Sequence, residues 1–229
     1  MTTSLTRPRS PRVQRVLRVN EIFNSIQGES SFAGRPCAFV RLMGCPLRCS
    51  YCDTEYAFHE GVTKSFDEIF ATLDAYGTSL VELTGGEPLA QPNAIPFLEE
   101  CVTRGFEMMI ETSGAFPIQG IPAAVKVILD IKTPGSGESH RNLWDNMGAL
   151  KPGVDEVKFV VTSRADFDYA VGVTHDRQFI ERGVTVLVSP AYGKVSARDL
   201  AEWVIASKLP LRFQVQMHKV IWEAETRGV

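Results

Sequence analysis

Short apolar runs recur along this chain of 229 residues, and segments with helical boundary signals lie between them. Several of these runs are nearly continuous in Val, Ile, Leu and Phe, as is typical of strands that are covered on both faces. Alternating strands and helices predict a mostly parallel sheet, either curled toward a barrel or doubly wound. The predicted strands are Cys37–Leu42, Leu80–Leu83, Glu107–Ile110, Val125–Ile131, Val157–Val161, Val184–Val188 and Leu211–Val215.

Capping signals mark the helices between these strands. Ser65–Glu68 forms a capping box that begins a helix, and Gly77 can end it. A second helix is expected over residues 93–104, and a third begins after Ser196. The stretch Thr112–Ala124 has little helical periodicity, so a full helix is expected to be missing there. The predicted fold is therefore α/β, an abbreviated, partial (β/α) TIM-like barrel of mostly parallel strands.

The composition is that of an ordinary globular chain, with 44% hydrophobic and 22% charged residues. It excludes a disordered, collagen-like or disulfide-scaffold protein. No apolar run reaches the roughly 20 residues that span a bilayer, and the start lacks an apolar secretory region. We therefore expect a cytoplasmic protein without a membrane partner.

The charge is unevenly distributed along the chain. The formal net charge is −3, although the first 18 residues hold five arginines and no acid. The remainder is therefore more acidic, which argues against a wide nucleic-acid-binding face. We interpret residues 1–15 as a flexible, Arg-rich extension and residues 16–229 as a single domain.

Three of the five cysteines, Cys45, Cys49 and Cys52, follow a predicted strand with the spacing C-x3-C-x2-C. A loop beyond the carboxyl end of a strand is where α/β folds place their active sites. Three thiolates can hold three irons of a [4Fe-4S] cluster and leave the fourth iron open to an exogenous ligand. A zinc site completed by His59 and a purely structural role are the alternatives.

The cysteine count also bears on the cellular compartment. An odd, crowded set makes a poor disulfide framework, which indicates a reducing cytosol. The remaining two, Cys37 and Cys101, fall inside a predicted strand and a predicted helix. We expect both to be core residues.

The cysteine loop, with the aromatic Tyr51 between its last two cysteines, resembles the radical S-adenosylmethionine superfamily. The sequence Thr84-Gly85-Gly86-Glu87-Pro88, after the next strand, resembles the glycine-rich motif of that superfamily. Further matches are similar to one of its families, the 7-carboxy-7-deazaguanine synthases. They are Glu21–Glu29, Gly34–Pro36, Phe39–Leu42, Cys52–Thr54 and Gln216–Lys219.

This resemblance implies a reaction and its cofactors. The substrate would be 6-carboxy-5,6,7,8-tetrahydropterin, converted by radical ring contraction with loss of ammonia to 7-carboxy-7-deazaguanine, on the way to queuosine and other 7-deazapurines. Cluster-bound S-adenosylmethionine would be reductively cleaved to a 5′-deoxyadenosyl radical that takes a hydrogen from substrate C6. The resemblance also implies Mg²⁺, a flavodoxin- or ferredoxin-like electron donor and a homodimer.

The resemblance assigns site residues as well. Cys45, Cys49 and Cys52 would hold the cluster, and the hydroxyl of Thr54 would bind Mg²⁺, a hard cation. The proposed substrate residues are Ile26, Gln27, Gly28, Glu29, Arg41, Thr84 and His218, and Val229 joins them because the chain end is short enough to fold back over the barrel mouth. The proposed S-adenosylmethionine residues are Gly86, Glu87, Ser113, Asp130, Ile131, Lys132, Ser189, Pro190, Ala191 and Tyr192.

Each assignment has a purely structural alternative. Thr54 could cap a turn, Arg41 could form a surface salt bridge, and Gln27–Glu29 could be an ordinary polar turn. Asp130 and Lys132 could form a structural ion pair, and His218 could be a core residue of a terminal strand.

Two other functions compete with the synthase reading. A glycyl-radical-enzyme activase shares the cluster and the fold but acts on a protein partner, so it does not need a pocket for a small acid. A non-catalytic metal-binding module would need no S-adenosylmethionine site at all.

Overall fold

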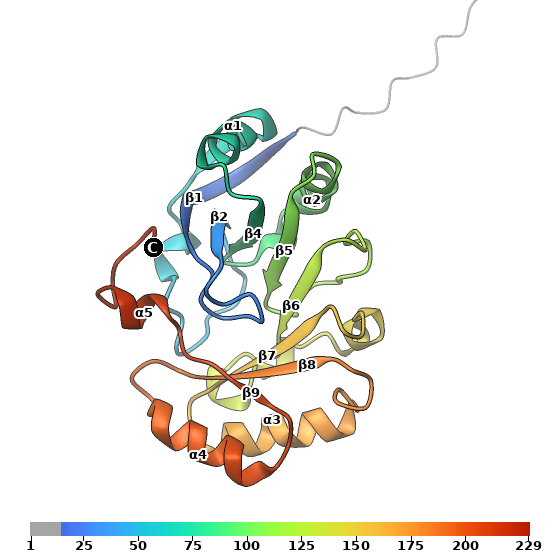
Figure 1. Ribbon diagram of the computed structural model, residues 1–229, viewed down its shortest axis with the longest axis vertical. Helices are drawn as coiled ribbons and strands as arrows, with labels where there is room; N and C mark the ends of the chain where they lie inside the picture. The colour runs from blue at the N-terminus through green and yellow to red at the C-terminus, as the bar shows by residue number, and fades with distance from the viewer. Residues whose placement is uncertain (1–14) are drawn as a thin grey trace, which may run out of the picture.

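The computed structural model describes residues 15–229, and most of the predicted Arg-rich extension lies outside this range. One nine-stranded sheet runs through the molecule in the order β3-β1-β2-β4-β5-β6-β7-β8-β9 (Figure 1). The β3–β1 and β1–β2 pairs are antiparallel, and every other pair is parallel. The strands are β1 (Val16–Ile26), β2 (Pro36–Leu42), β3 (Val62–Ser65), β4 (Leu80–Gly85), β5 (Glu107–Thr112), β6 (Lys126–Asp130), β7 (Glu156–Val161), β8 (Thr185–Pro190) and β9 (Arg212–Phe213). The predicted mostly parallel, partial barrel is confirmed.

Helices cover the outer face of this curved sheet (Figure 1). They are α1 (Phe66–Tyr76), α2 (Ala94–Thr103), α3 (Arg164–Asp176) and α4 (Ala197–Ser207). The capping box predicted at Ser65 is present, because its side chain accepts from the amide of Glu68 while the Glu68 carboxylate accepts from the amide of Ser65. The missing helix between β5 and β6 is also confirmed. The described part of the chain has no helix that is long and apolar enough to cross a membrane.

The side chains of the parallel strands alternate between two environments, as the period of two requires. Outward residues such as Val81 and Leu83 of β4 join the large core beneath the helices. The inward residues near the start of the strands form a second apolar cluster, to which Leu80, Met109 and Ile128 belong. Further along the same strands the inward positions become polar. The barrel interior therefore has an apolar floor and a polar mouth at the carboxyl ends of the strands.

Five elements differ from the sequence prediction. Strands β1 and β3 and helix α3 were not predicted, and β9 is only two residues long. The predicted terminal strand around His218 is wrong, because His218 begins the short helix α5 (His218–Ile221). Between β6 and β7 the chain forms only three 3-10 turns, Pro134–Ser136, Ser139–Arg141 and Trp144–Ala149.

Candidate active site

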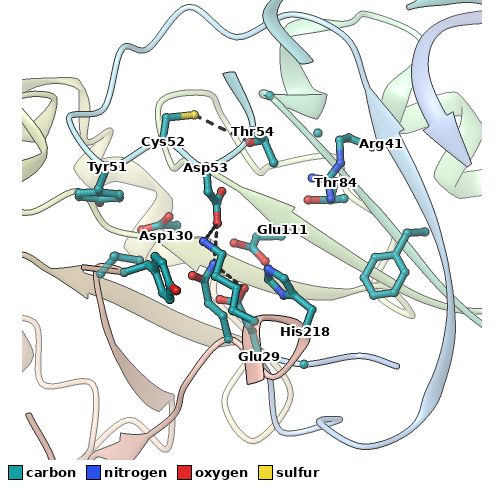
Figure 2. Close-up of a pocket in the computed structure, with 18 of the residues that line it drawn as sticks. Glu29, Arg41, Tyr51, Cys52, Asp53, Thr54, Thr84, Glu111, Asp130 and His218 are labelled. Atoms are coloured by element: carbon teal, nitrogen blue, oxygen red, sulfur yellow. Dashed lines mark hydrogen bonds and ion pairs between the residues drawn. The ribbon is translucent and has the colours of Figure 1, made fainter. Parts of the chain in front are cut away.

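A pocket of about 460 Å³ occupies the polar mouth of the barrel. Its wall contains inward-facing side chains from successive strands, including Arg41 on β2, Thr84 on β4, Glu111 on β5 and Asp130 on β6. Figure 2 shows these side chains directed at one shared space, with Thr54 above and His218 below. The site thus lies at the carboxyl ends of parallel strands, where the sequence placed it.

The pocket gathers nearly all of the predicted site residues. Those that line it are Ile26, Gln27, Gly28, Glu29, Arg41, Cys45, Cys49, Cys52, Thr54, Thr84, Gly86, Ser113, Asp130, Lys132, Ser189, Pro190, Ala191, Tyr192, His218 and Val229. Glu87 and Ile131 do not. Residues between 26 and 229 therefore converge on one cavity from strand ends, from the cysteine loop and from the C-terminal segment.

The three half-buried cysteines of the loop after β2 are unpaired and line this pocket. The amide of Cys52 donates to the carbonyl of Cys49 at 3.1 Å, which closes the turn between them. Burial raises the pKa of the Cys49 thiol to about 11 and also raises that of Cys45. Neither thiol is therefore activated as a nucleophile by its neighbours, and a metal is what would make them thiolates.

The glycine-rich loop packs directly on the cysteine loop. The amide of Glu87 donates to the carbonyl of Gly44 at 2.9 Å. A Cβ built on Gly86 would lie 2.8 Å from the Cβ of Cys45, and Gly44 backbone atoms would be closer still. Only glycine fits at this position. The two motifs thus form one cradle, whose residue types fit a [4Fe-4S] cluster with S-adenosylmethionine beside it.

The predicted role of Glu87 in binding S-adenosylmethionine is not supported. Its side chain is fully buried and accepts hydrogen bonds from the hydroxyls of Thr112 and Ser113 and from the amides of Ser113 and Leu89. These four donors occupy the carboxylate, and Glu87 lies outside the pocket lining. Glu87 instead ties the glycine-rich loop to the end of β5.

The last residue of β6 and the two residues after it supply two pocket residues and one core residue. The ammonium of Lys132 lies 2.6 Å from Oδ2 of Asp130, so the ion pair considered from the sequence is formed. The other oxygen, Oδ1, is buried and has no hydrogen-bond partner among the described residues, as is also true of the Tyr51 hydroxyl. Both side chains line the pocket, so each can still bind a ligand. Ile131, between Asp130 and Lys132 in the sequence, belongs to the outer core, which corrects its assignment to the cofactor.

Thr54 and Arg41 both line the pocket (Figure 2). Thr54 precedes a 3-10 turn, yet its hydroxyl makes no capping hydrogen bond, so the structural alternative for this residue is not supported. Its Oγ1 lies 3.8 Å from Sγ of Cys52. Arg41 is mostly buried and forms an ion pair with Glu21, from Nε to Oε1 at 2.8 Å.

In the turn after β1, the side-chain amide of Gln27, which was predicted to bind substrate, instead makes hydrogen bonds within the protein. The Gln27 amide oxygen accepts from the amides of Glu29 and Ser30, and Nε2 donates to Glu82. The polar-turn alternative therefore holds for the Gln27 amide, which shapes the pocket wall. Glu29 remains directed into the pocket, where its Oε2 lies 3.1 Å from the Lys158 ammonium.

The chain's last segment closes one side of the pocket. Asp53, beside Thr54, accepts from Gln216 at 2.7 Å and from Lys219 at 2.9 Å (Figure 2). Burial alone would raise the pKa of Asp53, but the Lys219 ammonium and these hydrogen bonds lower it to about 2. Burial lowers the pKa of His218 despite nearby carboxylates, so this imidazole is neutral at pH 7. A neutral ring can stack on or accept from a ligand.

Residues 224–229 also line the pocket, so the chain end, with Val229, folds back over the barrel mouth as predicted. Arg227 binds Glu60 at 2.9 Å, and its guanidinium lies 3.8 Å over the ring of Tyr56. These contacts hold the tail against the 3-10 turn Glu55–Phe58 (Figure 1).

A buried charged cluster beneath the mouth was not predicted. Lys158 of β7 lies between Glu111 of β5 and Glu29, and Glu82 of β4 is close by. Burial and the nearby Glu111 raise the pKa of Glu82 to about 8, and burial also raises that of Glu111. In the sequence Glu82 and Lys158 each stand between two apolar residues inside a strand, and that alternation is the signal that could have revealed them.

The zinc alternative is not supported by the position of its proposed fourth ligand. His59 is exposed and does not line the pocket. No group of three or more His, Cys, Asp or Glu side chains between residues 15 and 229 is arranged to hold a metal ion. In an iron–sulfur cluster each cysteine binds a different iron, so the three thiols need not meet at one point.

Comparisons with known proteins agree with this geometry. Residues 40–132 match the model of the Radical SAM superfamily. A 7-carboxy-7-deazaguanine synthase of Koribacter versatilis is 43% identical and covers 93% of this chain and 100% of its own length. The enzyme of the same name from Chlorobaculum tepidum is 41% identical, with 93% of this chain and 97% of its own length covered.

Solved structures confirm the fold. The crystal structure of QueE from Escherichia coli superposes with a TM-score of 0.73 at 24% identity, over 88% of this chain and 94% of that one. SuiB from Streptococcus suis bound to S-adenosylmethionine gives a TM-score of 0.55 at 17% identity, over 76% of this chain and 48% of that one.

Proposed function

This chain belongs to the 7-carboxy-7-deazaguanine synthase family of radical S-adenosylmethionine enzymes, and we propose that its pocket performs the Mg²⁺-dependent ring contraction of 6-carboxy-5,6,7,8-tetrahydropterin. Its cofactors are accordingly a [4Fe-4S] cluster and S-adenosylmethionine. Membership of this family argues against the two alternative functions, the glycyl-radical-enzyme activase and the non-catalytic metal-binding module. One observation carries the proposal, namely that a single pocket joins three free cysteines to an arginine, a threonine hydroxyl and buried carboxylates.

The cofactors would lie on the side of the pocket built by the two loops. Cys45, Cys49 and Cys52 would hold the cluster, and the Gly86 backbone and Asp130 would hold S-adenosylmethionine. When bound, these groups supply one-electron chemistry that generates a carbon radical able to take hydrogen from the substrate. The protein's part is to place that hydrogen within reach and to exclude water.

The substrate would lie on the opposite side, toward β1 and β2. The guanidinium of Arg41 matches a carboxylate, and Thr54 can add a hydroxyl ligand to a Mg²⁺ that bridges to the same group. Glu29 can accept from the amino group of the pterin, and the neutral ring of His218 can stack on it. Burial behind the C-terminal segment strengthens each of these contacts.

The reaction needs a reducing partner, and we propose a flavodoxin- or ferredoxin-like protein as the electron donor. All five cysteines are unpaired in the structure, which supports a reducing, cytoplasmic location. A homodimer is proposed on the family resemblance alone.

Anaerobic turnover tests the proposed reaction. The reconstituted enzyme is given 6-carboxytetrahydropterin, S-adenosylmethionine, reductant and Mg²⁺, and the products are identified by mass spectrometry. We expect 7-carboxy-7-deazaguanine, with little product when Mg²⁺ is omitted. Cleavage of S-adenosylmethionine without any deazaguanine product would contradict the proposed substrate.

Replacing Thr54 with alanine is expected to weaken the response to Mg²⁺ more than it weakens S-adenosylmethionine cleavage. The reason is that the hydroxyl is proposed to act on the metal at the substrate, and it serves no cap in the structure. Titration of Mg²⁺ in single-turnover assays measures the effect, and Thr54→Ser is the matched control because it keeps the hydroxyl. A half-saturating Mg²⁺ concentration equal to that of wild type would remove Thr54 from the metal site.

Deleting Arg227–Val229 is expected to raise the apparent KM for the pterin and leave uncoupled S-adenosylmethionine cleavage largely intact. These residues line the pocket and are anchored by the Arg227–Glu60 pair. Arg227→Ala should move KM in the same direction by a smaller factor, since it removes only the anchor. Steady-state kinetics decide the matter, and unaltered kinetics in the truncated enzyme would show that the tail has no part in the pocket.

A further inference from the structure

Strand β1 contains an irregularity that decides where one acidic side chain points. Val19 pairs with Leu42 and Glu21 pairs with Arg41, so Asn20 is an extra residue in the β1–β2 ladder. Without this bulge, Asn20 would face Arg41 and Glu21 would face Val40. A β-bulge commonly re-aims a side chain beside an active site. Here it moves Glu21 from the outer face of the sheet to the inner face.

The burial of the neighbouring residues confirms that the faces switch at this bulge. Leu17 and Val19, before it, belong to the outer core. Phe23, after it, belongs to the inner apolar cluster, whereas Ile22 packs on the outer core. The side chain of the extra residue is itself held in place, since Nδ2 of Asn20 donates to the backbone carbonyl of Glu60 at 2.7 Å.

Glu21 then holds Arg41 by one specific nitrogen. Oε1 of Glu21 accepts from Nε of Arg41 at 2.8 Å and from the hydroxyl of Tyr56 at 3.0 Å. The two terminal nitrogens of Arg41 make no hydrogen bond to any residue in the described range, and Arg41 lines the pocket. The guanidinium is therefore bound at its inner nitrogen and free at its outer edge.

We propose that Glu21 is a positioning residue that turns the free edge of Arg41 toward the substrate carboxylate, and that the bulge at Asn20 exists to bring it there. This inference rests on the proposed function, in which Arg41 binds that carboxylate. A guanidinium whose two outer nitrogens face one way can bind a carboxylate by two parallel hydrogen bonds. An unrestrained Arg41 could instead turn to other pocket acids, of which Glu111 and Asp53 are two.

Tyr56 contributes to the same arrangement. Its hydroxyl donates to Oε1 of Glu21 at 3.0 Å, which holds that oxygen in place. Arg227 lies over the ring of Tyr56, so the last residues of the chain pack on the outside of this group.

Equilibrium binding tests the inference without turnover. Reconstituted enzyme with S-adenosylmethionine and Mg²⁺, but no reductant, is titrated by calorimetry with 6-carboxytetrahydropterin and with tetrahydropterin, which lacks the carboxylate. The selectivity, the ratio of the two Kd values, reports carboxylate recognition alone. Glu21→Ala is expected to lower this selectivity about tenfold or more, as for the loss of one charge-assisted interaction. The Kd for tetrahydropterin is expected to stay unchanged.

Glu21→Gln is the rescue variant, because its amide oxygen can accept from both Arg41 and Tyr56. Its selectivity should stay within about threefold of wild type, since only the charge is lost. Glu107→Ala is the matched control, because it removes an exposed carboxylate paired with Arg35 far from the mouth. It should bind both ligands as wild type does.

Arg41→Ala separates this inference from the proposed function. If it keeps the selectivity for the carboxylated ligand, Arg41 is not the carboxylate partner and the proposed assignment fails. If Arg41→Ala loses the selectivity while Glu21→Ala keeps it, positioning by Glu21 is overturned. Equal weakening of both ligands by Glu21→Ala, or the same loss of selectivity in Glu21→Gln, overturns it as well.

Discussion

Replacing any one of Cys45, Cys49 or Cys52 with alanine is expected to abolish cluster assembly and turnover. Each thiolate would bind a different iron of the cluster. Among the described residues no other cysteine can replace a missing ligand, because Cys37 and Cys101 are buried in the two apolar cores. Iron and sulfide analysis with visible absorbance after anaerobic reconstitution measures the loss. The expected loss is the same for each of the three variants, since each thiolate binds a different iron.

The two core cysteines provide the matched controls. Cys37→Ala and Cys101→Ala should bind a full complement of iron and lose only thermal stability, because each removes a small buried side chain. Cluster loss in Cys101→Ala together with a retained cluster in Cys49→Ala would falsify the ligand assignment.

The sequence was a good guide to the parallel part of the fold and a poor one to β1. Each parallel strand is a short apolar run between turn signals, which is readable locally. In β1 the buried residues Leu17, Val19 and Phe23 are in phase along the sequence, yet Phe23 lies on the inner face and the other two on the outer face, because the bulge at Asn20 switches the faces. The polar residues Asn20 and Glu21 also interrupt the apolar alternation and conceal the strand. Pairing with β2 supplies the missing information, and no local pattern contains it.

The candidate site shows the same division. Motifs located the cysteine loop and the glycine-rich loop, and the carboxyl ends of parallel strands had to bring them together. The motifs did not predict the direction in which an individual side chain points. The hydroxyls at the end of the neighbouring strand β5 occupy the Glu87 carboxylate, and Ile131 alternates outward between two pocket residues. Glu82, Glu111 and Lys158 were missed for a related reason, since the sequence of a strand does not tell which of its two faces will line the interior of the barrel.

The last of these residues supports the second large prediction, that Lys158→Met strongly destabilises the protein at neutral pH. The Lys158 ammonium is buried and lies between the carboxylates of Glu29 and Glu111. Burial lowers its pKa, but the charges of Glu111, Glu29 and Asp130 outweigh burial and raise the pKa well above its ordinary value. Lys158 is therefore charged in the folded state at any pH below the ordinary lysine pKa, and its contribution is lost only in strong alkali. Removing one partner of a buried charge group costs about 3–5 kcal/mol, because the others are left uncompensated.

The pH dependence of this effect distinguishes charge from packing. Burial already raises the pKa of Glu111, and without Lys158 that pKa rises further. The folded variant therefore binds more protons than the unfolded chain as the pH falls toward the ordinary value of a glutamate. The deficit in unfolding free energy relative to wild type should therefore be largest near pH 8 and shrink toward pH 5. Urea unfolding at several pH values measures it, and Arg198→Met is the control, since the exposed Arg198–Glu202 pair should contribute no more than about 0.5 kcal/mol. A deficit that stays constant from pH 5 to pH 8 would mean that Lys158 acts through the packing of its methylene chain, and the charged cluster beneath the mouth would lose its electrostatic explanation.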